Sequence, residues 1–476
     1  MSPDPGVRLL VRRHAESLWN AERRIHGRSA GAGLSAAGAA EATAWAAELP
    51  SDGVGTIWCS DTERATATAG RAAQRLAAPL LRTPLLAEAG AGCLEGLTHA
   101  EAERRSPDHL RTWLARGDLD AIPEAEPGDR LQARALAFLA VAAGPGATSR
   151  FGGLQVVVTH AAFLRCLVNT ANRRCRTRPV PVAHTDRHLL VDPWRMLAPA
   201  RVGPSWRPST HAVDLGEDGP YLVKQVSAGA SERELARYLA LQRAVAAEIG
   251  SPPPLAAGAP SDGPATVVRR FVTGDTVPHR LDVRQEWRLL DFYQCTNRAL
   301  HRAVGAADRE RLPSLDNRVA DALRGTETEA SAPLRRLAAD RRVAALLSDR
   351  STVTDHDLHR DNTLRTPHGL VQIDLEGLST GPASWADACA LTGASALYPG
   401  AVQSADGARP HRLLLRGDSQ RAAELRVLTT IRLLLGLTFF LTGPRASAGA
   451  PARAYAELYR AALAALGPDQ ALEPAC

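Results

Sequence analysis

The sequence predicts a layered α/β domain at the N-terminus and a separate domain after it. Two short apolar runs, residues 7–11 and 154–158, are each followed within three residues by a histidine, as expected of buried parallel strands. Alanine-rich helical stretches lie between them at 35–49 and 65–78, and residues 56–59 form a further strand. Strands that alternate with helices imply an α/β sandwich whose ligands bind at the carboxyl ends of the strands.

The length and one proline-rich segment predict the domain boundary. At 476 residues the chain exceeds what one hydrophobic core usually serves. Residues 197–208 are rich in proline and glycine, which suits a connector, so we place the domains at 1–202 and 203–476. The segments after the boundary are strand-like at 211–215, 221–226 and 266–271 and helical at 231–249 and in most of the remainder. This order predicts a small α+β lobe followed by a larger helical lobe.

Composition excludes several classes of protein. Hydrophobic residues make up 45% and charged residues 23% of the chain, as in an ordinary globular protein. The seven cysteines are odd in number and form no CxxC pair, which argues against a disulfide framework or a zinc site and favours the cytoplasm. No signal peptide is visible at the N-terminus, and the apolar stretch 433–441 is too short to span a membrane, so we expect a buried helix there.

The net charge points to small anionic substrates. The formal charge is +6 and the isoelectric point is about 9.1, but the basic residues are spread along the chain and aromatic residues are only 4%. A nucleic-acid-binding protein would concentrate them in a stripe or patch. We therefore expect no nucleic acid and no membrane among the partners.

Four motifs in the first 200 residues occur in an order typical of one family. They are Arg13-His14-Ala15-Glu16 with Asn20, the segment from Ser60 to Ala69 that contains Arg64, the acidic loop with Glu88, and Val158-Thr159-His160. Together they resemble the histidine phosphatase superfamily, also called phosphoglycerate mutase-like, over nearly all of residues 1–202. The resemblance implies a three-layer α/β/α fold. Ala15 and Ala161 stand where the family usually has glycine.

The resemblance implies a phosphohistidine mechanism that needs no metal or other cofactor. His14 is the expected nucleophile, because an imidazole nitrogen can attack a phosphoryl group and form a covalent intermediate. Arg13, Arg64 and His160 would neutralise the phosphoryl oxygens, for which the planar guanidinium is well suited. Glu88 is the expected general acid, reused as a base when water attacks phosphohistidine.

Hydrolysis and mutase transfer use the same residues, so the sequence leaves both open. We favour a phosphatase, because the short domain leaves little inserted sequence to shield phosphohistidine from water. We expect His26 and His99 to be structural.

A second set of motifs follows residue 203. Asp357 and Asn362 are five residues apart, and Asp374 comes twelve residues after Asn362, behind a strand-like segment. With Gly381-Pro382, this spacing resembles the aminoglycoside phosphotransferase and choline kinase-like family, which has a protein-kinase-like fold. The family usually reads His-Gly-Asp where this chain reads Asp355-His356-Asp357.

The second resemblance implies ATP and Mg²⁺ as cofactors and phosphoryl transfer to a hydroxyl group. Asp357 would be the catalytic base, and Asn362 and Asp374 would hold Mg²⁺. His356 and His359 have a spacing that suits a metal site, but the catalytic loop explains them more fully.

One lysine supports this second resemblance. Lys224 is the only lysine of the chain and lies in a strand-like segment, where a compact ammonium group would bind ATP phosphates. Glu232, at the start of the next helix, is its expected ion-pair partner. Phe271 belongs to the expected hinge against which adenine would pack.

The two resemblances predict a bifunctional enzyme, a phosphatase joined to an ATP-dependent kinase. Its partners would be a small phosphoester and a hydroxyl acceptor that is sugar-like or cyclitol-like. Residues 391–476 hold nine arginines against six acidic residues, which favours a neutral or anionic acceptor over a polycationic antibiotic. The alternatives are a phosphatase regulated by a nucleotide-binding pseudokinase and an antibiotic-modifying kinase.

Overall fold

The structure is a computed structural model, and it packs into two compact units. It describes residues 7–29, 32–115, 119–144, 147–172, 187–191, 210–215, 219–228, 231–259, 264–278, 280–375, 377–395, 397, 408–416, 419–442 and 450–466. The first unit is Met1–Val202, Pro208–Leu239 and Pro254–Phe271, and the second is Gly203–Arg207, Ala240–Pro253 and Val272–Cys476. The packing therefore does not follow the predicted boundary at 203, since much of the predicted small lobe packs with the N-terminal part. The predicted connector, 197–208, lies outside the described residues.

The first unit is built on a five-stranded sheet with the order β3-β2-β4-β1-β5. Its strands are β1 (Val7–Arg13), β2 (Val54–Cys59), β3 (Leu80–Arg82), β4 (Leu154–Thr159) and β5 (Arg187–Val191). The first four are parallel and β5 is antiparallel to β1. Arg13 is in register with Thr159, so β1 and β4 end side by side.

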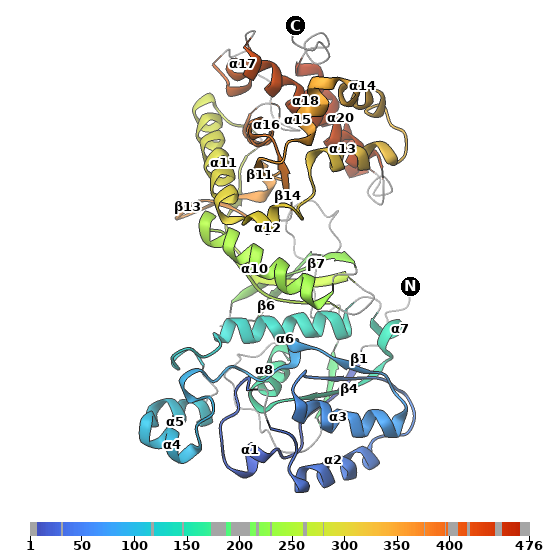
Figure 1. The fold of residues 1–476 in the computed structure, drawn as a ribbon, viewed down its shortest axis with the longest axis vertical. Coiled ribbons are helices and arrows are strands. Elements are labelled where there is room, and N and C mark those ends of the chain that lie inside the picture. The colour runs from blue at the N-terminus through green and yellow to red at the C-terminus, as the bar shows by residue number, and fades with distance from the viewer. Residues whose placement is uncertain are drawn as a thin grey trace. The chain divides into compact units, whose positions relative to one another are not determined.

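Helices cover both faces of this sheet (Figure 1). On one face, α2 (Ala36–Glu48) and α3 (Glu63–Leu76) share a core with Leu10 and Val158. On the other, α6 (Gly128–Ala143) and α8 (Ala161–Ala171) share a core with Leu9 and Val157. The alternation of neighbouring strand residues between two cores is the pattern of a sheet buried on both faces. The strands and helices predicted for residues 7–158 are confirmed, with shifts of a few residues at their ends.

Short helices connect these elements. They are α1 (Leu18–Ala21), η1 (Pro84–Leu86), η2 (Gly92–Leu94), α4 (His99–Arg105), α5 (Pro107–Ala115) and α7 (Ala147–Phe151).

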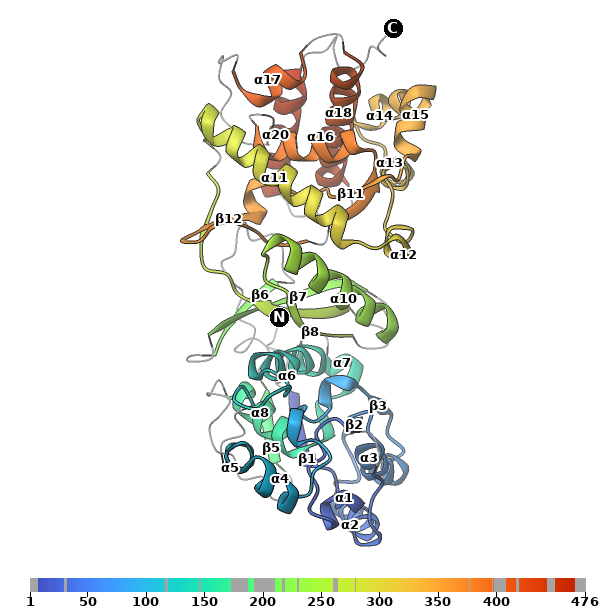
Figure 2. The same cartoon turned by 60° about the vertical axis from the view of Figure 1, so that its left-hand side comes forward.

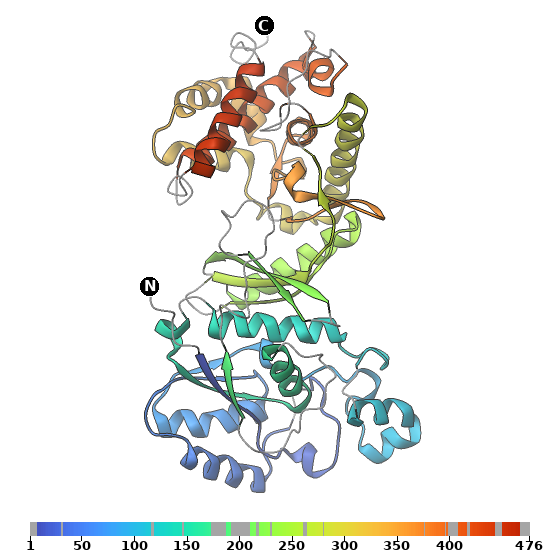
Figure 3. The ribbon, with the colours of Figure 1, turned by 180° about the vertical axis from the view of Figure 1, so that it is seen from behind.

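A second, antiparallel sheet packs on α6 within the first unit. Its strands are β6 (Thr210–Asp214), β7 (Pro220–Ala228), β8 (Pro254–Gly258) and β9 (Pro264–Arg270), in the order β6-β7-β9-β8. Figure 3 shows α6 between the two sheets. Every residue of α6 from Leu131 to Ala143 is buried, and Tyr221 Oη donates a hydrogen bond to Gln132 Oε1 at 2.8 Å. This helix is buried on all of its sides because it lies between two sheets.

The second unit is mostly helical, as predicted. Its larger helices are α11 (Val283–Ala303), α13 (Leu315–Arg324), α14 (Ser331–Ala339), α15 (Arg341–Ser348), α16 (Ala383–Ala394), α18 (Gln420–Leu441) and α20 (Ala450–Leu466). Figure 2 shows α16 between α11 and α18. Shorter helices are α12 (Ala306–Arg309), η4 (Arg360–Asn362) and α17 (Pro410–Leu414), and α10 (Glu232–Ile249) contributes its second half to this unit. The apolar stretch 433–441 is part of α18 and is mostly buried, although Phe439 is 48% exposed.

Two small sheets connect the loops of the second unit. β11 (Thr352–Asp355) pairs with β14 (Leu378–Gly381), and β12 (Thr363–Thr366) pairs with β10 (Asp275–Thr276) and β13 (Gly369–Gln372). In the described part of the chain, no helix is both long and apolar enough to cross a membrane.

Candidate active site

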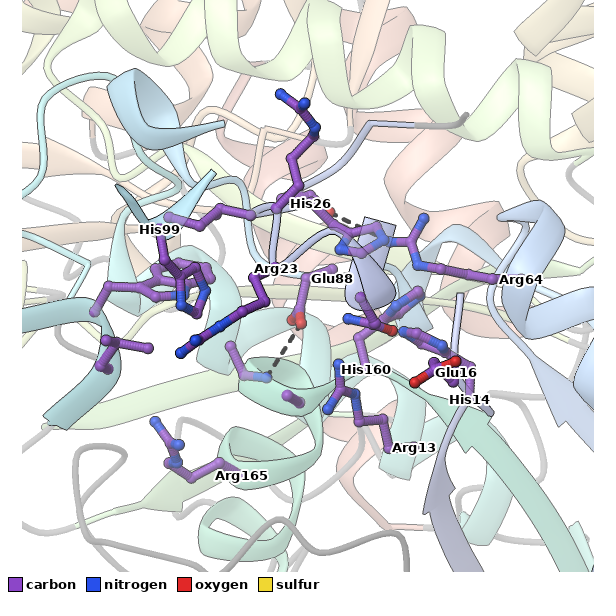
Figure 4. Close-up of a pocket in the computed structure, with 18 residues that line it drawn as sticks. Arg13, His14, Glu16, Arg23, His26, Arg64, Glu88, His99, His160 and Arg165 are labelled. Carbon is purple, nitrogen blue, oxygen red and sulfur yellow. Dashed lines mark hydrogen bonds between the residues drawn. The ribbon is translucent and has the colours of Figure 1, made fainter. Parts of the chain in front are cut away.

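Two histidines meet where β1 and β4 end. His14 follows β1 and His160 follows β4, and the backbone N–H of His14 donates to the carbonyl of Thr159 at 2.9 Å. The two rings lie edge to face with their centroids 5.0 Å apart, and both are almost fully buried (Figure 4). The parallel pairing of two strands far apart in the sequence is what brings these side chains together.

The His14 ring is held in one tautomer. Its Nδ1 donates to the carbonyl oxygen of Ala15 at 2.7 Å, which leaves the lone pair on Nε2. Burial lowers the pKa of His14 well below its usual value, and the nearby Arg13 and Arg64 lower it further. The ring is therefore neutral at physiological pH, which is the form that can act as a nucleophile.

Two arginines surround the histidines. Arg64, near the start of α3, is fully buried, and its guanidinium donates to the carbonyl of Ser29 at 3.1 Å. The Nε atoms of Arg13 and Arg64 are buried and have no hydrogen-bond partner within the described part of the chain. Unpaired buried donors of this kind suit the oxygens of a bound anion.

His160 is the N-cap residue of α8 and lines the same cavity. Burial lowers its pKa well below the usual value, with smaller contributions from His14 and Arg64. Its Nε2 is 3.4 Å from Thr62 Oγ1, and its Nδ1 has no hydrogen-bond partner among the described residues. His160 is thus a second neutral ring with capacity to bind an oxygen atom.

Glu88 is fixed at the N-terminus of α8. Its carboxylate accepts from the backbone N–H groups of Ala89 (2.9 Å), Phe163 (3.1 Å) and Ala162 (3.3 Å). A helix N-terminus favours a carboxylate at this position. Glu88 lies between the histidine pair and Arg23 in Figure 4, so it can exchange a proton with a group bound there.

These side chains line one cavity of about 430 Å³. The structure therefore brings His14, Arg13, Arg64, Glu88 and His160 together as the sequence predicts. The methyl groups at the two unusual positions do not fill the cavity. Ala15 is buried with its N–H bonded to Thr68 Oγ1 at 3.1 Å, and Ala161 is one of the cavity-lining residues.

The cavity includes residues that sequence reasoning missed. They are Arg23, Arg24, Ile25, His26, His99, Trp113, Leu114, Ala162 and Arg165, and Glu16 and Asn20 of the first motif and Gly27 after it line the cavity as well. His26 and His99, expected to be structural, both line the cavity. Burial, then Arg64 and Arg13, lowers the pKa of His26 to about 3, so this ring is neutral too. The one sequence signal for these additional residues was the basic pair Arg23-Arg24, nine residues after His14. Trp113 and Arg165 come from distant helices and had no such signal.

The second unit assembles another set of predicted residues. The amide nitrogen of Asn362 donates to the carbonyl of Asp357 at 3.2 Å, and the N–H of Ile373 donates to the carbonyl of Asn362 at 2.8 Å. Asp374 follows directly in the left-handed conformation, with φ of 62°. Asp357, Asn362 and Asp374 therefore belong to one cluster of loops.

The residues predicted to bind ATP lie in the first unit. Lys224 is in β7, opposite Thr210 and Val267, and the N–H of Phe271 donates to the carbonyl of Pro220 at 3.1 Å. Glu232 is the first residue of α10, but its side chain is outside the described part. These three roles stay predictions.

The unusual Asp355-His356-Asp357 sequence has a defined geometry. Asp355 is fully buried and its Oδ1 accepts from the N–H of Asp357 at 2.9 Å. His356 donates from Nδ1 to the carbonyl of Gly377 and accepts at Nε2 from Arg318 at 3.0 Å. Burial lowers the pKa of His356 to about 4, so its ring is neutral. The extra carboxylate and imidazole thus support the loop around Asp357.

Comparisons with known proteins agree with the geometry of the first unit. The sequence profile of the histidine phosphatase superfamily (branch 1) matches residues 9–185. Over 188 residues the chain is 32% identical to "Probable phosphoglycerate mutase GpmB" of Escherichia coli strain K12 / DH10B, covering 38% of this chain and 85% of that protein. Solved structures that match include a mycobacterial glucosyl-3-phosphoglycerate phosphatase in complex with VO3 (26% identity, TM-score 0.30, 37% of this chain and 84% of that one) and YhfR of Bacillus stearothermophilus (24%, 0.34, 38% and 90%). The chain belongs to the histidine phosphatase superfamily, and its N-terminal unit carries the site of a phosphatase or mutase.

Proposed function

We propose that the first unit hydrolyses a small phosphomonoester through a phosphohistidine on His14. The observation that carries this proposal is the tautomer of His14, whose Nδ1 is bonded to the Ala15 carbonyl while Nε2 remains available. Nε2 attacks phosphorus, the bond from phosphorus to the ester oxygen breaks, and the leaving oxygen takes a proton from Glu88, which must enter this step as the carboxylic acid and leaves it as the carboxylate. Water then attacks the phosphorus of phosphohistidine, gives a proton to Glu88, and restores the neutral ring.

Charge neutralisation is the role proposed for the surrounding groups. Arg13 and Arg64 hold the phosphoryl oxygens through donors that have no partner in the described protein, and His160 supports the same oxygens. Fixed donors of this kind need no rearrangement as charge moves from the ester oxygen to the phosphoryl group.

Hydrolysis is favoured over mutase transfer by the short domain, although the similar E. coli protein is described as a probable phosphoglycerate mutase. The test is turnover of phosphorylated metabolites in water enriched in ¹⁸O. Phosphate that carries ¹⁸O identifies hydrolysis, whereas an isomerised phosphoester without labelled phosphate identifies a mutase.

A matched pair of variants tests the role of His14 itself. His14→Ala is expected to reduce turnover by roughly 10³-fold or more, because it removes the nucleophile. His368→Ala, which alters an exposed histidine in the turn between β12 and β13, is expected to leave turnover unchanged. Equal turnover by both variants would contradict the proposal.

We further propose that the second unit transfers the γ-phosphoryl group of ATP to a hydroxyl group. The observation in favour is the loop cluster in which the Asn362 amide holds the backbone of Asp357 and adjoins Asp374. Asp357 would accept the proton of the hydroxyl group as its oxygen attacks phosphorus.

The residues present fit Mg²⁺, which the proposed reaction requires. With its nitrogen bonded to Asp357, the Asn362 side chain has its oxygen available, and Asp374 offers a carboxylate. Mg²⁺ commonly takes one or two such protein ligands and completes its shell with phosphate and water. When bound, it would neutralise charge on the ATP phosphates.

Lys224 is proposed to contact the ATP phosphates, with Glu232 as its ion-pair partner and Phe271 beside adenine. Because the chain has a single lysine, an amine-reactive acyl-phosphate derivative of ATP has Lys224 as its only lysine target. Labelling of Lys224 that excess ATP prevents is the expected result. Labelling that ATP does not affect would contradict this nucleotide site.

The joined reactions are proposed to be sequential steps that move phosphate between hydroxyl groups of a sugar-like or cyclitol-like metabolite. Mass spectrometry of sugars, cyclitols and their phosphates with Mg-ATP tests this. Asp357→Asn is expected to abolish ATP turnover and to leave phosphatase turnover intact. If Asp357→Asn changes neither, the second unit is a pseudokinase or a regulator, and strong phosphorylation of kanamycin-like amines would identify an antibiotic-modifying kinase.

A further inference from the structure

We infer that the second unit binds a small sugar-like carboxylate in a cavity beside Asp357. The cavity has a volume of about 350 Å³. It is lined by Arg318, Asp321, Ala322, His356, Asp357, His359, Trp385, Arg432, Leu435, Gly436, Thr438, Phe439, Phe440, Thr442 and Tyr459. The ligand can bind in this cavity whether or not a reaction follows. Only its role as phosphoryl acceptor rests on the kinase activity proposed above.

One wall of the cavity is a single face of α18. Arg432, Leu435, Gly436 and Phe439 are spaced at i, i+3, i+4 and i+7, so they lie in one stripe along the helix. The ring of Tyr459 from α20 packs against Gly436, where any added Cβ atom would overlap it. The wall is therefore largely apolar and carries one cationic side chain.

Two side chains of the wall have buried hydrogen-bond donors with no partner among the described residues. Trp385 is fully buried and its indole Nε1 has no partner within the described residues. Arg318 donates from its guanidinium to His356 Nε2 at 3.0 Å, but its buried Nε likewise has no partner there. The hydroxyl groups of Thr438 and Thr442 donate to carbonyls of their own helix, those of Leu434 and Thr438. A ligand that accepts hydrogen bonds would satisfy the two unpaired donors.

Other titratable groups near Asp357 are paired or have shifted pKa values. Asp321 is bonded to Arg324 on the same helix. Burial, then the nearby Asp357, raises the pKa of Asp355 well above its usual value, which favours its protonated form. His356, with its pKa near 4, is neutral.

Two arginines line the cavity together with Asp357. Arg432 is 9% exposed, and although burial disfavours its charge, Tyr459 and Cys389 raise its pKa, so it stays protonated. A carboxylate suits this lining, because it can pair with a guanidinium group and is repelled less by Asp357 than a doubly charged phosphate would be.

The remaining surface suits a body with apolar faces and hydroxyl groups. Phe439, Tyr459 and Trp385 present aromatic surface, against which the CH groups of a sugar ring can pack. A hydroxyl group of such a ligand would lie in the same cavity as Asp357.

Four ligands that differ only at carbon 6 test the inference: glucuronate, glucuronamide, glucose and glucose 6-phosphate. Calorimetric titration of the full chain without ATP is expected to give saturable binding of glucuronate. Binding of the amide and of glucose is expected to be weaker by about tenfold or more, since each loses a hydrogen bond to a charged group. Glucose 6-phosphate is also expected to bind more weakly than glucuronate.

Variants connect this binding to the cavity. Arg432→Gln and Arg318→Gln are each expected to weaken glucuronate binding by about tenfold or more, and Arg432→Lys to recover part of the loss. Arg453→Gln, which removes a charge from an exposed position of α20, should leave binding unchanged. Thermal unfolding and circular dichroism exclude variants that fail to fold.

Several results would overturn the assignment: no saturable binding of glucuronate, equal binding of the amide, tighter binding of glucose 6-phosphate, or unchanged binding in both folded Gln variants. Turnover with Mg-ATP is measured separately. Arginine-dependent binding without phosphorylation would reject the kinase and keep the site, whereas phosphorylation that neither Gln variant alters would reject the site and keep the kinase.

Discussion

The cavities beside His14 and beside Asp357 both contain buried arginines, but they differ in the group that those arginines face. In the first unit, Arg13 and Arg64 face two histidines whose pKa values are lowered by burial and by the arginines themselves. In the second, Arg318 and Arg432 lie near the carboxylate of Asp357. The same residue type thus keeps a nucleophile neutral in one cavity and lies beside a carboxylate in the other.

This comparison indicates how much negative charge a ligand of each cavity can carry. The first cavity is lined by five arginines and two glutamates, an excess of cationic groups that can take a doubly charged phosphoryl group. In the second, Arg318 and Arg432 lie with Asp357 and with Asp321, which is bonded to Arg324, and this lining suits the single negative charge of the proposed carboxylate. Arginine content alone therefore does not identify the ligand of a site, because the paired charges must be counted first.

The largest effect that would sharpen the comparison is expected at Glu88. Glu88→Gln removes the proposed proton donor and should reduce hydrolysis of an alkyl phosphate by about 10²–10⁴-fold. Hydrolysis of p-nitrophenyl phosphate should fall much less, because nitrophenolate leaves without a proton. Steady-state kinetics on the two esters provide the comparison, and equal losses would show that Glu88 does not protonate the leaving oxygen.

Truncation tests whether the two sheets of the first unit form one core. A fragment of residues 1–202 exposes the side of α6 that contacts Tyr221, Val223 and Val268, each of which is fully or almost fully buried in the structure. The free energy of unfolding is expected to fall by roughly 1.5–3 kcal/mol for each large side chain that is no longer buried. The exposed faces of separate fragments are also expected to associate with one another.

A fragment of residues 1–271 keeps both sheets and is the control for that truncation. It is expected to be monomeric by size-exclusion chromatography and to unfold at a higher temperature. If the shorter fragment equals it in both measurements, the second sheet contributes little to the stability of the phosphatase.

A smaller effect is expected from Gly436→Ala in α18. The added methyl group would overlap the ring of Tyr459, and overpacking of this kind costs about 1–3 kcal/mol. The expected results are a lower unfolding temperature and weaker glucuronate binding, with phosphatase turnover unchanged. An unchanged affinity for glucuronate would place Tyr459 outside the ligand site.

The smallest effect concerns the pH dependence of the first cavity. His14 must be neutral to attack phosphorus. Because its pKa is lowered well below 6.5, the ring stays neutral even somewhat below that pH. We therefore expect kcat/KM to fall only when the pH drops through the lowered pKa. Arg13→Gln removes one of the cations that lower this pKa, which should move the acidic fall in kcat/KM to higher pH. The profile of kcat/KM against pH in both proteins is the measurement, and a shift to lower pH would refute the electrostatic argument.

The sequence predicted three of the five strands of the main sheet, β1, β2 and β4, and the residues at the sheet edge, because both depend on local patterns. Apolar runs such as 7–11 and 154–158 are recognisable as buried strands, and parallel strands place the residues after them together. His14 and His160 follow from this rule alone, and the family resemblance adds Arg64 and Glu88.

What the sequence did not predict depends on contacts between distant elements. Trp113 and Arg165 reach the first cavity from α5 and α8, and His26 and His99 carry no local signal that separates a cavity wall from a core position. The packing of the second sheet on α6 was also missed, because a helix that is mostly apolar shows only that it is buried, not what buries it.

The position of α6 has a consequence for how this protein can change in evolution. Each substitution in the helix alters its fit to two sheets at once. One sheet contains β1, which leads into His14, and the other contains β7 with Lys224, the only lysine of the sequence. Residues on opposite sides of one helix are then expected to covary across related sequences, and neither part of the gene can be exchanged for a homologous copy without its counterpart. Recombinants that keep α6 with both of its original sheets should be the ones that survive selection.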